Sequence, residues 1–179
     1  MVKRSVTAFV VLVSLFITDM ALSMPEELKS FLKDRRQVRI CIDLKNSSAD
    51  KRVDTALLKK ILEEGFLARR SYDFQIADTP DKADLILDGD VKEYLWQTVD
   101  PVDEVWGAVS TAMDAAIADN YARMQVQMEL IEAKNSRVIW SDKVQSTVTH
   151  HVMPQDASYD IVYKRFLKSL MTELFKKSS

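Results

Sequence analysis

The chain has 179 residues, with 25 basic and 27 acidic side chains, and its formal net charge is −2. Nucleic-acid-binding domains usually carry a concentrated basic face, and this composition offers none. The single cysteine excludes an internal disulfide, so an apolar core must stabilise the fold. No repeat and no low-complexity tract is present, and the length suits one domain behind a leader.

The first 23 residues have the pattern of a secretory signal peptide. Lys3 and Arg4 precede a mostly apolar run, and the small residues Ala21 and Ser23 occupy the −3 and −1 positions of a cleavage site. The run is shorter than the roughly 20 apolar residues that a spanning helix needs. We therefore predict a signal peptide over residues 1–23 that is cleaved after Ser23, with an uncleaved anchor as the alternative.

A short helix and a single domain are predicted behind the leader. Residues 24–36 form an amphipathic pattern that we interpret as an N-terminal connecting helix. Residues 37–177 then make up one α/β domain. A lipid anchor is not expected, because Met24 stands where a lipoprotein signal places a cysteine.

The first predicted strand begins the domain. Apolar residues alternate with polar ones from Val38 to Lys45, which is the period of a half-buried strand. Cys41 falls on the more polar face beside Arg39. Two interpretations follow: a reactive thiol that could form a mixed disulfide, or a half-buried strand residue with no chemical role.

A helix is predicted next, from about Ala49 to Glu64. Asn46-Ser47-Ser48 supplies candidate caps for its start. Gly65 fits the left-handed residue that often ends a helix, and Phe66 fits the accompanying apolar contact.

Two strands follow, over Tyr72–Ile76 and from Asp84 to about Trp96. Gly89 inside the longer strand predicts a bulge or a close packing contact. This strand also carries an acidic set that could be imagined as metal ligands or catalytic carboxylates. The acidic set comprises Asp84, Asp88, Asp90 and Glu93. We interpret it as a solvated face, because the sequence fixes no base or second acidic cluster beside it.

An inserted helix is predicted over about residues 101–120. Its apolar side chains fall on one face at helical spacing. That face either packs on the sheet or forms a surface for a partner, a second copy or a membrane edge. Trp106 is the first candidate for partner binding, because exposed tryptophan often anchors interfaces. The other partner-binding candidates are Val105, Val109 and Met113.

The clearest pattern is a long β-hairpin over Tyr121–Thr149. Its first arm alternates apolar and polar residues with a period of two, which excludes a helix. Between the arms, Asn135 is the residue expected to accept a positive φ. Trp140 on the second arm is predicted to be a core residue whose replacement by alanine costs roughly 3 to 5 kcal/mol.

A last helix is predicted to end near Lys176. It follows His150 and His151, the two histidines of the chain. Adjacent strand residues point to opposite faces, so these imidazoles are not expected to form a zinc site. The elements together predict a two-layer α/β sandwich. It would have a mixed, mostly antiparallel sheet of four to five strands, two long helices on one face and the inserted third helix.

Two segments carry a resemblance to a known group of proteins. Ala83–Val91 reads ADLILDGDV and Met128–Ser141 reads MELIEAKNSRVIWS, behind an exported leader and a strand–helix unit. In this succession the chain resembles the small envelope lipoproteins of Gram-negative bacteria. These include the auxiliary lipoproteins of lipid-transport ABC systems, the lipopolysaccharide-assembly lipoprotein, the curli-secretion lipoprotein and, by fold, the amino-terminal domain of TolB. The chain departs from them in lacking the lipobox cysteine and in its long inserted segment.

The resemblance implies a non-enzymatic periplasmic accessory protein. Such a protein would support envelope assembly or transport by binding an envelope protein or a second copy of itself, with lipid or polysaccharide as further ligands. It would lie in the periplasm or at the membrane surfaces there, without a cofactor, metal or nucleic acid. The alternative function is a periplasmic carrier that holds an apolar ligand, such as a lipid, between the sheet and the inserted helix. An enzyme is disfavoured, because no nucleophile, base and orienting group can be placed together from the sequence.

Overall fold

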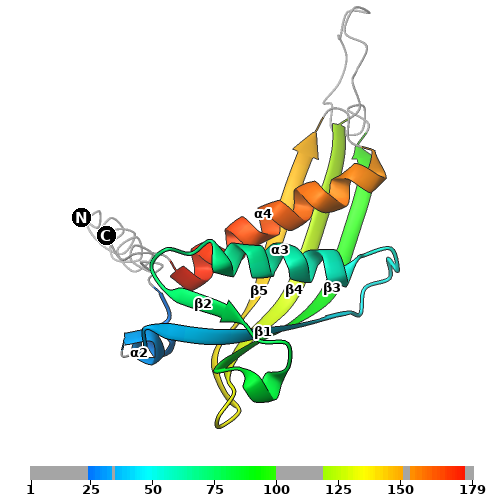
Figure 1. Ribbon diagram of the computed structural model, residues 1–179. Helices are drawn as coiled ribbons and strands as arrows, with labels where there is room; N and C mark the ends of the chain where they lie inside the picture. Colours follow the sequence, from blue (N-terminus) through cyan, green and yellow to red (C-terminus); the bar gives the residue numbers. More distant parts are fainter. Residues whose placement is uncertain (1–23, 34, 100–118, 151–153, 176–179) are drawn as a thin grey trace, which may run out of the picture.

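The computed structural model describes residues 24–33, 35–99, 119–150 and 154–175. These residues form a five-stranded sheet with two long helices across one face, so the predicted two-layer α/β sandwich is confirmed (Figure 1). The elements are α2 (Glu26–Lys33), β1 (Gln37–Asn46), α3 (Thr55–Leu67), β2 (Asp73–Ile76), the 3-10 turn η1 (Pro80–Lys82), β3 (Leu85–Val99), β4 (Asp119–Glu132), β5 (Arg137–His150) and α4 (Gln155–Phe175). The predicted leader lies outside the described residues.

The strand order is β2-β1-β3-β4-β5, and the sheet is mixed. β1 pairs in parallel with both β2 and β3, and α3 provides the crossover from β1 to β2. β3, β4 and β5 pair antiparallel, in agreement with the predicted hairpin and the mostly antiparallel sheet. Asp119 and Asn120, which the sequence assigned to the inserted helix, begin β4 instead because they pair with the end of β3.

α3 begins later than its apolar periodicity predicted. Asp54 is the N-cap, and its Oδ1 accepts a hydrogen bond from the backbone N–H of Leu57 at 2.9 Å. The predicted caps form a turn instead. Asn46 Oδ1 accepts from both the N–H and the hydroxyl of Ser48, and this local bonding competes with a helix start.

Gly65 does not end α3, so its predicted role as a left-handed stop is wrong. The helix continues to Leu67, and Ala68 is the C-cap in an ordinary right-handed conformation. A β-carbon at position 65 would lie 2.3 Å from Leu167 Cδ1. This glycine therefore serves the close approach of α3 and α4.

The predicted hairpin is confirmed, with a different turn residue. The apolar side chains of its first arm are buried, as the period of two requires: Met124, Val126, Met128 and Leu130. At the turn, Ser136 has the positive φ of 55°. Asn135 instead bridges the turn, because its amide donates to Glu132 Oε2 at 2.8 Å and its oxygen accepts from Arg137 N–H at 3.1 Å.

A bulge near the start of β5 breaks the alternation of the second arm. Leu130 pairs with Trp140 and Ile131 with Val138, which leaves Ile139 as the extra residue. Ile139 is buried, and Trp140 is half-buried against the core. Trp140 thus lies on the predicted side of the sheet, but with part of its ring in water.

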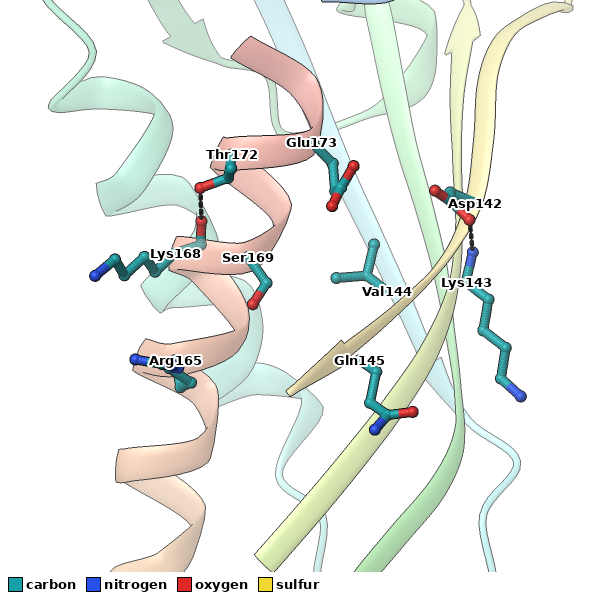
Figure 2. Close-up of a pocket in the computed structure, with 9 residues that line it drawn as sticks. All are labelled: Asp142, Lys143, Val144, Gln145, Arg165, Lys168, Ser169, Thr172 and Glu173. Atoms are coloured by element: carbon teal, nitrogen blue, oxygen red, sulfur yellow. Dashed lines mark hydrogen bonds between the residues drawn. The ribbon is translucent and has the colours of Figure 1, made fainter. Parts of the chain in front are cut away.

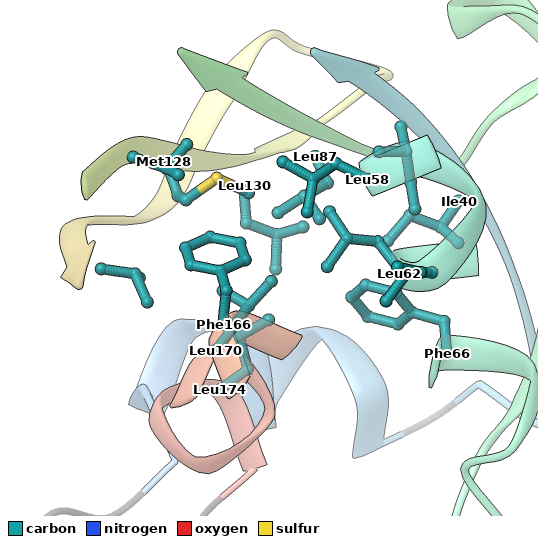
Figure 3. Packing of buried hydrophobic residues seen from close by; sticks show 14 of the residues in the cluster. Ile40, Leu58, Leu62, Phe66, Leu87, Met128, Leu130, Phe166, Leu170 and Leu174 are labelled. Carbon is teal, nitrogen blue, oxygen red and sulfur yellow. The ribbon is translucent and has the colours of Figure 1, made fainter. Parts of the chain in front are cut away.

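The main core fills the space between the sheet and the two long helices (Figure 3). Phe66 of α3 and Phe166 of α4 are among its fully buried side chains. Gly89 on β3 permits close packing here, since a β-carbon would lie 2.6 Å from Leu44 and 2.7 Å from Met128 Sδ. The apolar side of α2 is also buried in this core, so that helix packs onto the domain.

A second, small cluster covers the other face of the sheet at β1. The connection from β2 to β3 passes over β1 and is held by Ala77 N–H bonding to Ile40 O and Asp84 N–H to Arg39 O. It buries Cys41 under alanines, at 3 % exposure. Burial raises the pKa of this thiol. The polar face predicted for Cys41 is therefore closed, which argues against a reactive thiol.

Candidate functional site

β5 forms one edge of the sheet, and α4 and α2 pack beside it. It is 14 residues long, against the roughly five to six residues of a typical strand, and its one neighbour in the sheet is β4. The pairing with β4 is regular from Trp140 to His150. Among the described residues, the stretch Val144–Thr149 forms no backbone bond to any element other than β4. Alternate N–H and C=O groups of this stretch therefore point outward without a strand partner.

This open stretch lacks the devices that usually protect an edge. Natural edges are blunted by charged side chains, proline, bulges or a short length. Val144–Thr149 reads VQSTVT, with no charge and no proline, and its pairing has no register shift. The bulge and the charged Asp142 and Lys143 lie before it.

α4 runs beside the edge and is fixed to it. Its buried side packs on the sheet, and Ser146 Oγ donates to the carbonyl oxygen of Val162 at 3.3 Å. The solvent side of α4 next to β5 therefore has a set position relative to the strand.

Two adjoining clefts lie between β5 and α4. The first has a volume of about 270 Å³ (Figure 2). Its lining residues are Asp142, Lys143, Val144, Gln145, Arg165, Lys168, Ser169, Thr172 and Glu173. The second has a volume of about 490 Å³. Its lining residues are Thr147, Val148, Thr149, Ile161, Lys164, Arg165 and Lys168. Because Arg165 and Lys168 line both, we treat the two clefts as one β5–α4 groove.

The β5–α4 groove is basic toward the end of β5. Arg165 and Lys168 form no ion pair among the described residues, whereas Lys164 bonds to Asp160 at 2.7 Å. The second cleft has no acidic lining residue and holds the exposed apolar side chain of Ile161. The groove thus offers backbone hydrogen-bonding groups, uncompensated positive charge and an apolar contact side by side.

None of the partner-binding candidates named from the sequence is among the described residues. Trp106, Val105, Val109 and Met113 lie outside the described residues, as does His151. Among the described residues, no three His, Cys, Asp or Glu side chains are grouped to hold a metal ion. None of the described helices has the length and apolar content needed to cross a bilayer.

Three of the four carboxylates in the acidic set form ion pairs. The pairs are Asp84 with Arg39, Asp90 with Lys92 and Glu93 with Arg123. Burial alone would raise the pKa of Asp84, but hydrogen bonds from Arg39 outweigh it and hold the pKa below its usual range. Each of these three carboxylates thus has a basic partner of its own, and the three do not converge on one site.

Sequence reasoning missed the β5–α4 groove, although part of its signal is visible. The uncharged run Val144–Thr149 is typical of a strand without edge protection. No local sequence pattern indicates which arm of the hairpin forms the edge of the sheet, because that depends on β3 pairing with β4. Likewise, the positions of Arg165 and Lys168 beside β5 follow from the packing of α4.

No protein-family model and no curated protein sequence matches this chain. Solved structures do match it. A putative neuraminyllactose-binding hemagglutinin homolog from Helicobacter pylori is 16 % identical with a TM-score of 0.50, and the match covers 79 % of this chain and 84 % of that one. The two proteins share a fold.

Two other solved structures have lower scores. The PelC dodecamer from Paraburkholderia phytofirmans is 17 % identical, with a TM-score of 0.48 and coverage of 81 % of this chain and 92 % of that one. The lipoprotein GNA1162 from Neisseria meningitidis is 13 % identical, with a TM-score of 0.43 and coverage of 75 % and 99 %.

Proposed function

We propose that this chain is a non-enzymatic accessory protein of the bacterial cell envelope that acts by binding another protein. The leader pattern supports export, because Lys3 and Arg4, the apolar run and the small residues before Met24 are what a signal peptidase substrate carries. The mature domain would then work in the periplasm. Self-association is one form that such binding can take.

The observation that carries this proposal is the open edge of β5 beside a basic groove. A sheet edge supplies backbone donors and acceptors that another chain can pair with, and side-chain pockets beside it add selectivity. The lining residues of the β5–α4 groove include no cysteine and no histidine. The open edge and the cations beside it suit recognition of an extended chain.

A carrier for an apolar ligand is the second candidate function. The sequence places such a ligand between the sheet and the inserted helix over about residues 101–120, and residues 100–118 lie outside the described residues. The β5–α4 groove is lined mainly by polar and charged side chains. That lining favours a protein partner over a lipid at the groove.

Native mass spectrometry of the protein, expressed with its leader and purified from envelope extracts without detergent, tests the proposal. We expect masses of complexes with another protein or with further copies of the chain. A stoichiometric lipid adduct on a chain without any protein partner would overturn the proposal in favour of the carrier. An intact mass that includes the leader would overturn the predicted processing after Ser23.

A further inference from the structure

We infer that the β5 edge receives an extended acidic segment of the partner protein, which adds to the sheet as a sixth strand. This inference rests on the proposed function and names how the partner is recognised. The segment would pair with Val144–Thr149, where the edge is regular and uncharged. Six residues in a strand span about 20 Å, close to the usual length of a strand in a sheet.

The backbone of β5 supplies the sequence-independent part of this binding. Each outward N–H and C=O group of Val144–Thr149 can bond to the added strand as in any antiparallel or parallel ladder. β5 is held in place for this by β4 on its inner side and by the Ser146 bond to α4. The partner alone would have to become ordered.

The groove supplies the selectivity. Side chains alternate across an added strand, so every second one would lie on the helix side of the sheet, toward α4. There it meets Val148 and Ile161, which accept an apolar side chain, and Arg165 and Lys168, which attract carboxylates. The partner segment is therefore expected to combine apolar and acidic residues on that side.

The charge of the groove argues against a second copy of this chain as the strand. Antiparallel pairing of two β5 edges would bring the groove of one copy against that of the other. Arg165 and Lys168 would then face their own counterparts, and like charges at such distances repel. An acidic segment removes this repulsion and pairs both cations.

The probe for this inference is a labelled ten-residue peptide in which every second residue is alternately glutamate or valine, with threonine between them. Glutamate and valine then face the same side of the added strand. Binding to the leaderless protein is followed by fluorescence anisotropy. We expect saturable binding that weakens with added salt. The same peptide with alternate backbone nitrogens methylated cannot form a ladder and is expected not to bind. Hydrogen exchange should slow at alternate amides of Val144–Thr149 on binding, which locates the peptide.

Charge reversal provides the decisive comparison. The double variant Arg165→Glu, Lys168→Glu should bind the acidic peptide about tenfold more weakly or worse, because each change removes an attraction and adds a repulsion. It should gain binding to a lysine–valine peptide. The matched control is Lys60→Glu, Arg70→Glu, which changes the net charge equally at exposed positions away from the groove. This control variant should still prefer the acidic peptide to the lysine–valine peptide.

Three results would overturn the inference. The first is an equal loss of affinity in both double variants, which indicates unspecific attraction. The second is peptide binding without slower exchange in β5. The third is a combination of two observations: the protein does not bind the acidic peptide, and it dimerises through β5 in sedimentation experiments. Each can occur while native mass spectrometry still finds a protein partner, so the proposed function can survive the failure of this inference.

Discussion

Gly65 of α3 and Leu167 of α4 approach each other so closely that a side chain at position 65 would have to displace the Leu167 side chain. A β-carbon at position 65 would lie 2.3 Å from Leu167 Cδ1 and 3.1 Å from its Cγ. The glycine lies inside the helix, where it is intrinsically unfavourable. Its role is thus to let the two helices that cover the sheet pack side by side.

Replacing Gly65 with alanine should destabilise the domain. Alanine gains about 1 kcal/mol of helix propensity, but overpacking typically costs about 1–3 kcal/mol, so we expect a net loss of about 1 kcal/mol. Urea unfolding measures the change. In a Leu167→Ala background the same substitution should become stabilising, because the clashing atoms are gone. A single variant as stable as the wild type would contradict this packing.

Tyr159 should make the domain sensitive to alkaline pH. Its hydroxyl donates to Asp50 Oδ2 at 2.9 Å, and burial together with this carboxylate raises its pKa from 10.0 to about 12. A pKa raised by folding contributes stability that is complete below about pH 10 and is lost as the pH rises toward about 12. Tyr159→Phe should therefore flatten the decline of unfolding free energy over this range.

Buried Tyr94 and Tyr163 also have raised pKa values, so the decline should become shallower without disappearing. Asp50→Asn tests whether the Asp50 carboxylate contributes to the raised pKa of Tyr159. The substitution should lower this pKa in an ultraviolet titration. Identical pH profiles for the wild type and Tyr159→Phe would refute the assignment.

Cys41 should be unreactive in the folded protein. Ala77, Ala83 and Ile86 surround it on the face away from the helices, and burial raises its thiol pKa. Reaction with a thiol-specific disulfide reagent at about pH 8 should be on the order of 100-fold slower than in denaturant, because it must wait for local opening. Rapid and complete labelling under native conditions would restore the reactive interpretation.

Trp140 should contribute less stability than its size suggests. Trp140 is half-buried, whereas Leu130, its pairing partner on β4, is 1 % exposed. Leu130→Ala should cost about 2–5 kcal/mol, the range for an emptied core site, and Trp140→Ala less than Leu130→Ala. The exposed Val138 is the control, with an expected effect of Val138→Ala within about 0.5 kcal/mol. A larger loss for Trp140 than for Leu130 would show that its ring is enclosed in solution.

The local patterns predicted the elements better than their ends. The period of two from Met124 to Leu130 was decisive, since one face of a strand meets the core and the other meets water. Helix ends were harder to place. The sequence indicates Asn46-Ser47-Ser48 as caps, whereas Asp54 caps α3 in the structure, because several residues near a helix start can cap it and tertiary packing selects one.

The sequence by itself determined the periodicities, and with them the strands, the helices and the two-layer arrangement, because a one-sided apolar pattern has to be buried against another element. Only the tertiary structure decided that β5 is the edge, that Gly65 serves a helix contact and that Cys41 is covered. Each depends on which segments meet in space, and residues distant in the chain leave no local pattern for that. The β5–α4 groove belongs to this second kind, since Arg165 and Val148 become neighbours only when α4 packs on the sheet.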